Sequence, residues 1–384
     1  MTITGLPDGF AASDLVRRAA MPAEGGDVAG DLAAALGPGP FAAVILFISP
    51  QTDLEALRAR LSVFAAPVIG CTTAGEIADG YADGQVVALA LPAAHFATQA
   101  VLVPDLGALD SQAVIGQVIR ARMALERSHP EFTQEFGFVM VDGLSVREDE
   151  LAAVLAQGLG PVPMFGGSAG DGTRFRQTFV VHDGQALQHA AVLLVVRTDC
   201  RVRVFSLDHL VPTGRRMVVT EADPLRRRVR QINAEPAAQE YARLLGKDPA
   251  QLTSFTFAAH PLVVRIGGMH HVRAIQRVDD NGDLVFFSAI DEGLVLTLAE
   301  PRDMVAHLEA ELLRLSVGGA PVAILACDCI LRRMEAQEKQ MTGAVSALLR
   351  AHRVVGFSTY GEQWNAMHVN QTMTGVAFYP PEPR

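Results

Sequence analysis

The chain has 384 residues, of which 49% are hydrophobic, and it carries a formal net charge of −10. This length suits two domains of about 150 residues each, and the acidic balance argues against sequence-specific DNA binding. No apolar run reaches the about 20 residues of a membrane-spanning helix, so we expect no membrane insertion. The first residues lack a basic leader before an apolar stretch, and the four cysteines are scattered, so we expect a cytoplasmic protein.

Three segments of the chain repeat one pattern of strand, helix, strand, glycine-rich loop and strand. The first combines strand 41–48, a helix, the loop GCTTAGE at 70–76 and strand 85–92. The second combines strand 135–141, helix 149–160, the loop GGSAGDG at 166–172 and strand 190–196. The third combines strand 321–330, helix 343–352, the loop GFSTYGE at 356–362 and strand 374–380. Apolar strands joined by helices imply covered sheets. We therefore predict an α/β fold, with repeated strand-helix-strand-Gly loop-strand units forming two sheet-based domains.

A different region, about 200–320, separates the second and third units. Asp223 followed by proline predicts the start of a helix over 224–233 that includes the most basic run of the chain, 226–230. Pro236 and Gly246 predict the start and end of a second helix. Three strands are expected after these helices, at 262–267, 270–278 and 284–290. An Asn-Gly pair predicts a hairpin turn between the second and the third of these strands.

Several motifs occur together and in one order along the chain. They are GCTTAGEI at 70–77, GGSAGDG at 166–172, HPLVVRIGG at 260–268, CDCILRR at 327–333 and the stretch GFSTYGEQWNAMHVNQTMTG at 356–375. In these motifs the chain resembles the FIST family, a bacterial sensory module with an N-terminal and a C-terminal part. The resemblance implies a lead segment at 1–40, a FIST N domain at 41–210 and a FIST C domain at 211–384.

CDCILRR together with MHVNQT resembles the FIST subgroup that binds haem and senses nitric oxide. The resemblance implies a non-enzymatic cytoplasmic sensor that holds haem b, binds nitric oxide and modulates a partner sensor histidine kinase or cyclic-di-GMP enzyme. Such proteins affect biofilm behaviour through two-component signalling. A homodimer is compatible with this interpretation, although no heptad pattern argues for one.

His368 is the first candidate for the axial ligand of haem iron, because neutral imidazole is the commonest protein ligand in that position. Trp364 and Met367 could supply an apolar wall, and the polar residues 370–372 could orient the ring. His260 is the second choice. The alternative for either histidine is an ordinary hydrogen bond within the fold.

Other residues of the candidate site are Tyr360, Cys327, Arg332 and Arg333. A Cys327 thiolate could bind haem iron, Cys327 and Cys329 could form a redox-sensing pair, or both could be small buried residues. The two arginines could pair with haem propionates or with acids of their own helix.

Two further functions stay open. One is a sensor for a small amino-acid-like ligand without haem, bound by the glycine-rich loops and Arg332. The other is a hydrolase, because the GGSAG segment around Ser168 fits the G-x-S-x-G pattern. The GFSTYGE turn has counterparts in the other units, whereas QWNAMHVNQT at 363–372 has none. We therefore expect function in the second of these segments.

Overall fold

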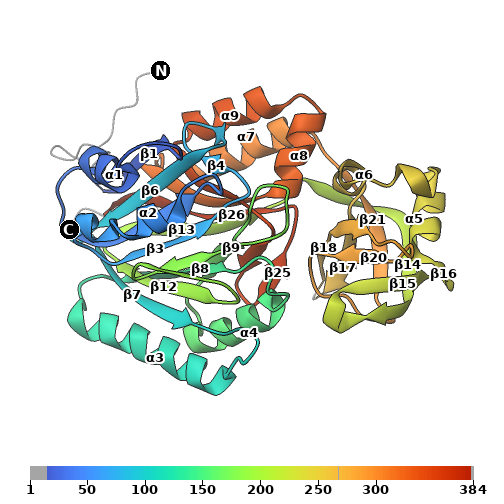
Figure 1. The fold of residues 1–384 in the computed structure, drawn as a ribbon, viewed down its shortest axis with the longest axis horizontal. Helices are drawn as coiled ribbons and strands as arrows, with labels where there is room; N and C mark the ends of the chain where they lie inside the picture. The colour runs from blue at the N-terminus through green and yellow to red at the C-terminus, as the bar shows by residue number, and fades with distance from the viewer. Residues whose placement is uncertain (1–14, 267, 382–384) are drawn as a thin grey trace.

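The computed structural model describes residues 15–266 and 268–381. Part of the expected lead segment, the last residue of strand 262–267 and the end of the expected FIST C domain lie outside these residues. The described chain forms a large α/β body and a small, mostly β domain at one side of it (Figure 1). We use "small domain" for residues 210–301 and "body" for the remainder.

Three sheets build the body. The first has the order β1-β6-β2-β3-β10-β11 (Arg17–Pro22, Gln85–Pro92, Phe41–Ile48, Val68–Thr72, Val180–His182, Gln185–Leu187). The second has the order β25-β24-β9-β8-β12-β7 (Met367–Val369, Glu362–Trp364, Met164–Ser168, Gln134–Val141, Ala191–Thr198, Phe96–Val103). The third has the order β13-β26-β22-β23-β4-β5 (Cys200–Leu207, Met373–Pro381, Ala323–Cys329, Val354–Thr359, Glu76–Ile77, Tyr81–Ala82).

The three predicted units have the same pairing pattern. In each, the first strand pairs in parallel with the second and antiparallel with the last: β2 with β3 and β6, β8 with β9 and β12, β22 with β23 and β26. The predicted α/β class and its repeated unit are therefore confirmed. The sheets also exchange strands, since β4 of the first unit joins β23 and β24 of the third unit joins β9.

One hydrophobic core lies among the inner faces of the three sheets, with Phe47, Phe138 and Phe357 in its centre. Helices cover the outer faces, each over its own sheet (Figure 1). The first sheet is covered by α1 (Val28–Leu36), α2 (Leu54–Arg58) and the 3-10 helix η1 (Leu61–Phe64). The second is covered by α3 (Ser111–Ser128) and α4 (Glu148–Leu159). The third is covered by α7 (Met304–Leu315), α8 (Ile330–Glu338) and α9 (Thr342–Ala351). Burial of both faces explains why the central strands are almost continuously apolar.

The small domain is a twisted sheet inserted between the second and third units. Its order is β18-β17-β21-β14-β15-β20-β19, with β16 beside β15 (Met269–Arg273, Leu262–Ile266, Val295–Pro301, Leu210–Asp223, Arg228–Ile232, Leu284–Phe286, Ile275–Val278, Glu235–Pro236). Its helices are η2, α5, η3 and α6 (Pro224–Arg226, Ala237–Leu245, Pro249–Gln251, Ser254–Ala259). Gly246 ends α5 in the left-handed conformation, as predicted. The Asn-Gly turn between β19 and β20 is also confirmed.

The predicted helix over 224–233 is wrong. Asp223 caps only the single turn η2, because Arg227 takes a left-handed conformation with φ +51° and ends it. The chain then continues as β15, which buries Val229 and Ile232 in the core of the small domain. The predicted strand 270–278 is also divided, since β18 pairs with β17 whereas β19 pairs with β20.

Candidate functional site

The segment 362–369 forms a hairpin, β24 and β25, at the edge of the second sheet beside the small domain (Figure 1). Gln363 is paired with His368 across the hairpin, and Trp364 with Met367. Since successive side chains of a strand point to opposite faces, Trp364 and Met367 lie on the face away from His368. The two residues expected to wall the ring therefore do not flank it. Trp364 instead packs against the central core.

His368 is 1% exposed, and its Nδ1 accepts a hydrogen bond of 3.2 Å from the Gln363 amide nitrogen. The same nitrogen donates to the Ser168 hydroxyl oxygen over 3.0 Å. Burial lowers the pKa of His368, nearby Glu148 and Asp149 raise it, and Arg227 lowers it. In the neutral ring with Nδ1 as acceptor, the proton is on Nε2. His368 therefore offers a hydrogen-bond donor at Nε2.

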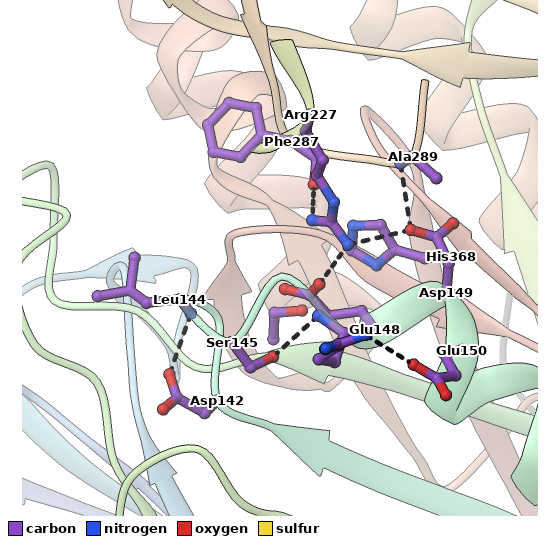
Figure 2. A network of polar contacts seen from close by, with 12 residues as sticks. Asp142, Leu144, Ser145, Glu148, Asp149, Glu150, Arg227, Phe287, Ala289 and His368 are labelled. Carbon is purple, nitrogen blue, oxygen red and sulfur yellow. Dashed lines mark hydrogen bonds and ion pairs between the residues drawn. The ribbon is translucent and has the colours of Figure 1, made fainter. Parts of the chain in front are cut away.

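Charged groups from both parts of the protein meet next to His368 (Figure 2). Arg227 of the small domain donates to Glu148 over 2.6 Å and to Asp149 over 3.0 Å, at the first turn of α4. The backbone N–H of Ala289 also donates to Asp149, over 3.1 Å. These contacts tie the small domain to the N-terminus of α4, where carboxylates are favoured by the helix dipole.

Polar atoms without a partner gather at this junction. Among the described residues, they include His368 Nε2, both amide atoms of Asn370 and Oε1 of Gln363 on the body side. Arg273 Nε and Ser288 Oγ are the corresponding atoms of the small domain. Buried polar groups are nearly always hydrogen-bonded, so such a group of exceptions needs an explanation. We call these five residues the junction site.

Gly361 makes room for this arrangement. A Cβ at position 361 would lie 2.3 Å from Cε1 and 2.7 Å from Nε2 of His368. It would also lie 2.7 Å from Nδ2 of Asn370. Both polar atoms therefore face the same small space beside the Gly361 backbone, which only glycine leaves free.

An apolar cluster surrounds the contact between the two parts. Phe175 stacks on Tyr360 with ring centroids 4.4 Å apart, and Phe287 of the small domain lies 5.7 Å from Phe175. The chain enters and leaves the small domain side by side, since the N–H of Arg302 donates to the carbonyl of His209 over 2.7 Å. Because the two connections between the small domain and the body lie side by side, the small domain can rotate about them as a rigid unit.

Comparison with family models identifies the family, although the boundary between the two models falls within the small domain. The FIST N domain model matches residues 42–235, and the FIST C domain model matches residues 237–365. The chain belongs to the FIST family. FIST domains are sensory ligand-binding domains of signalling proteins. The chain matches no curated protein, and none of the helices in residues 15–266 and 268–381 has the length and apolar character to cross a membrane.

In this FIST protein the other predicted site residues do not converge on His368. Arg332 is buried between Asp328, at 2.7 Å, and His209 Nδ1, at 2.8 Å. Arg333 bonds Asp83 over 2.7 Å and lies over the Tyr81 ring. Both guanidinium groups therefore bond the body's own residues, although Nη2 of Arg332 has no hydrogen-bond partner among the described residues.

Tyr360, Cys327 and His260 also have other surroundings. Tyr360 donates to Asp171 and accepts from the N–H of Phe175, which holds the second glycine-rich loop. Cys327 lies in the central core, where burial raises the pKa of its thiol. His260 ends α6 in the small domain, and its carbonyl accepts from Tyr241.

The acids of the glycine-rich loops serve the loops themselves. Glu76 accepts from Thr73 and Glu362 accepts from Thr359, the same three-residue spacing in units one and three. Glu362 also accepts from the backbone and hydroxyl of Thr372. Burial raises the pKa of Glu362 to about 8 and that of Glu76 to about 7.

Among the described residues, no histidine is hydrogen-bonded directly to Ser168. The Gln363 amide stands between its hydroxyl and His368. An amide cannot accept the serine proton, so this order of groups lacks the nucleophile–base contact that a hydrolase needs.

Haem does not fit at His368 in this arrangement. Nε2 faces only the small space beside Gly361 that Asn370 also lines, so a porphyrin bound through Nε2 would have to displace both residues. The ring is also surrounded by amides and charged groups, whereas haem has a large apolar surface to bury. Haem binding by this chain stays a prediction from resemblance.

Sequence reasoning singled out His368 but missed Gln363, Arg227, Arg273 and Ser288. Gln363 could have been found from the hairpin, since two strands of three residues joined by a tight turn pair positions 363 and 368. The small-domain residues had no comparable signal, because they lie far from His368 in the sequence.

Proposed function

We propose that this FIST protein is a signalling sensor that binds a small polar ligand of amino-acid size at the junction site. The observation that supports this most directly is the group of partnerless buried polar atoms on His368, Asn370 and Gln363. Leaving a buried polar group unpaired costs about 1–3 kcal/mol, so a ligand that pairs several of them gains much of that free energy. Haem would leave most of these atoms unpaired.

The chemistry of the site selects a ligand with both donors and acceptors. His368 Nε2 and the Asn370 amide nitrogen donate, whereas Gln363 Oε1 and Asn370 Oδ1 accept. Arg273 adds a positive charge, whereas the carboxylate of Glu148 is already paired with Arg227. A zwitterion matches this set, with its carboxylate toward His368 and Arg273 and its ammonium group toward the amide oxygens.

The signal would be the position of the small domain. A ligand at the junction contacts residues of both parts, so it favours the arrangement in which both sets of contacts form. The paired connections at His209 and Arg302 allow the domain to respond as a unit. We propose that a partner protein, a sensor histidine kinase or a cyclic-di-GMP enzyme as the family resemblance implies, detects this change.

The test is a thermal-shift screen of amino acids and related small zwitterions, followed by calorimetry of any compound that raises Tm. Asn370→Ala should weaken binding at least about tenfold, since it removes hydrogen bonds of about 1.5 kcal/mol in total or more. Gln157→Ala is the control, because this exposed amide on α4 bonds only its own helix. Equal affinity of wild type and Asn370→Ala for the bound compound would overturn the proposal, as would a complete screen without any shift.

A further inference from the structure

Three chemically reactive side chains meet far from the junction site, at the edge of the body. His95 lies in the turn between β6 and β7, and Asp199 and Cys200 lie where the chain passes from β12 to β13. Asp199 and Cys200 are more than 100 positions from His95 in the sequence, so the fold alone brings them together. His95 Nδ1 lies 3.0 Å from Oδ1 of Asp199, and that oxygen lies 3.7 Å from Sγ of Cys200.

We propose that His95, Asp199 and Cys200 bind a divalent transition-metal ion, with zinc as the best match. Zinc takes nitrogen, oxygen and thiolate ligands at about 2.0–2.3 Å in a tetrahedral arrangement, which places neighbouring ligand atoms roughly 3.2–3.7 Å apart. The two measured separations agree with such edges to within a few tenths of an ångström, and all three ligand atoms lie within 4.8 Å of one another. A water molecule would complete the tetrahedron.

Thr198 holds the backbone of this group in place. Its hydroxyl donates to the carbonyl of His95 over 2.7 Å and accepts from the N–H of Cys200 over 3.0 Å. Thr198 is fully buried and is paired with Phe96 across the sheet. One hydroxyl therefore fixes both chain segments that carry the ligands, as residues behind a metal's ligands commonly do.

Charge and access also suit a cation. A carboxylate and a thiolate provide two negative charges, which a divalent ion neutralises. The side chains of His95 and Asp199 are 16% and 22% exposed, so an ion can reach them from solvent, whereas Cys200 is fully buried behind them. Metal binding would displace the thiol proton of Cys200 to solvent.

The bound ion would have a structural effect. β12 belongs to the second sheet, β13 to the third and β6 to the first. An ion bound by these three residues would link the turn after β6 to the chain segment that joins β12 of the second sheet to β13 of the third. Because metal binding to the folded chain alone stabilises it, the ion would raise Tm with increasing concentration.

The test uses Co²⁺ as a coloured substitute for zinc, with full-length protein free of any histidine tag. We expect one Co²⁺ per chain, with a near-ultraviolet thiolate-to-cobalt band and visible bands of tetrahedral intensity. Cys200→Ser should abolish the thiolate band, and His95→Ala should lower the affinity at least about tenfold. His182→Ala is the matched control, because His182 also lies near an aspartate, Asp183, at 3.6 Å, and its side chain is 19% exposed.

Two outcomes would contradict metal binding by His95, Asp199 and Cys200. A wild-type titration without a thiolate band would show that the group is only an ion pair between His95 and Asp199. Equal affinity of wild type and His95→Ala would also overturn it. If Cys200→Ser fails to fold, the wild-type spectrum and stoichiometry still decide, because they need no variant.

Discussion

Arg227 of the small domain and Glu148 of the body form a buried ion pair 2.6 Å long, with side chains 7% and 3% exposed. The pair closes the junction on the side of α4, next to His368 (Figure 2). It is one of several contacts that hold the small domain against the body, together with the hydrogen bonds of Ala289 to Asp149 and of Gln371 to Ala258.

Removing the guanidinium group of Arg227 should loosen the junction. Arg227→Met leaves the Glu148 carboxylate buried without its partner, and breaking a buried pair in this way costs about 3–5 kcal/mol. We expect a lower Tm and faster proteolysis at the connections near residues 209 and 302. Arg226→Met is the control, because Arg226 is exposed and bonds only the nearby Asp223. Similar Tm values for the two variants would contradict the role assigned to Arg227.

Gly361→Ala should disturb the junction site directly. The added methyl would come within 2.7 Å of His368 and Asn370, and such overpacking costs about 1–3 kcal/mol. We expect lower stability and loss of small-ligand binding by calorimetry. Gly343→Ala on α9 is the control, since no atom lies within 4 Å of its added Cβ. Unchanged ligand affinity in Gly361→Ala would place the ligand elsewhere.

Stability should depend on pH through Glu362. Burial raises its folded-state pKa to about 8, so between about pH 4.5 and 8 the folded protein keeps a proton that the unfolded chain loses. The contribution of this group is therefore largest at low pH and is lost as the pH rises through that window.

The measurement is chemical denaturation of wild type and Glu362→Gln from pH 5 to pH 8. The free energy of unfolding of wild type, relative to the variant, should fall by up to about 1.4 kcal/mol per pH unit. Thr372→Val, which removes one hydrogen bond to the carboxyl group, should keep the pH dependence. A constant difference between wild type and Glu362→Gln across this range would show that the carboxyl group does not titrate there.

His368 should not be an iron ligand. A porphyrin bound at Nε2 would have to displace Gly361 and Asn370, which line the small space beside that atom. We therefore expect any Soret absorption after haem addition to be the same in wild type and His368→Ala. His260→Ala is the companion variant, because this histidine lies in the small domain and is only partly buried. A Soret band that is lost only in His368→Ala, and that shifts with nitric oxide in wild type, would restore the haem interpretation.

The repeated units could be predicted from sequence because their information is local. Continuous apolar strands, glycine-rich loops and the turn residues around Pro236, Gly246 and Asn281 each act within a few positions of themselves. The helix expected over 224–233 failed for a tertiary reason. Val229 and Ile232 are buried only in a strand of the small domain, and that burial outweighs the helix-start signal of Asp223.

The amino-acid sequence by itself determined the α/β class, the three repeated units and the segment 363–372 as the part of the third unit without a counterpart. Only the tertiary structure decided which face of the hairpin at 362–369 meets the small domain, and that Gln363 rather than Trp364 contacts His368. It also decided that Arg332 bonds Asp328, that Cys327 lies in the central core and that His95 lies near Cys200. The physical reason is that contacts between distant segments follow from how sheets exchange strands and pack, and no local spacing encodes that choice.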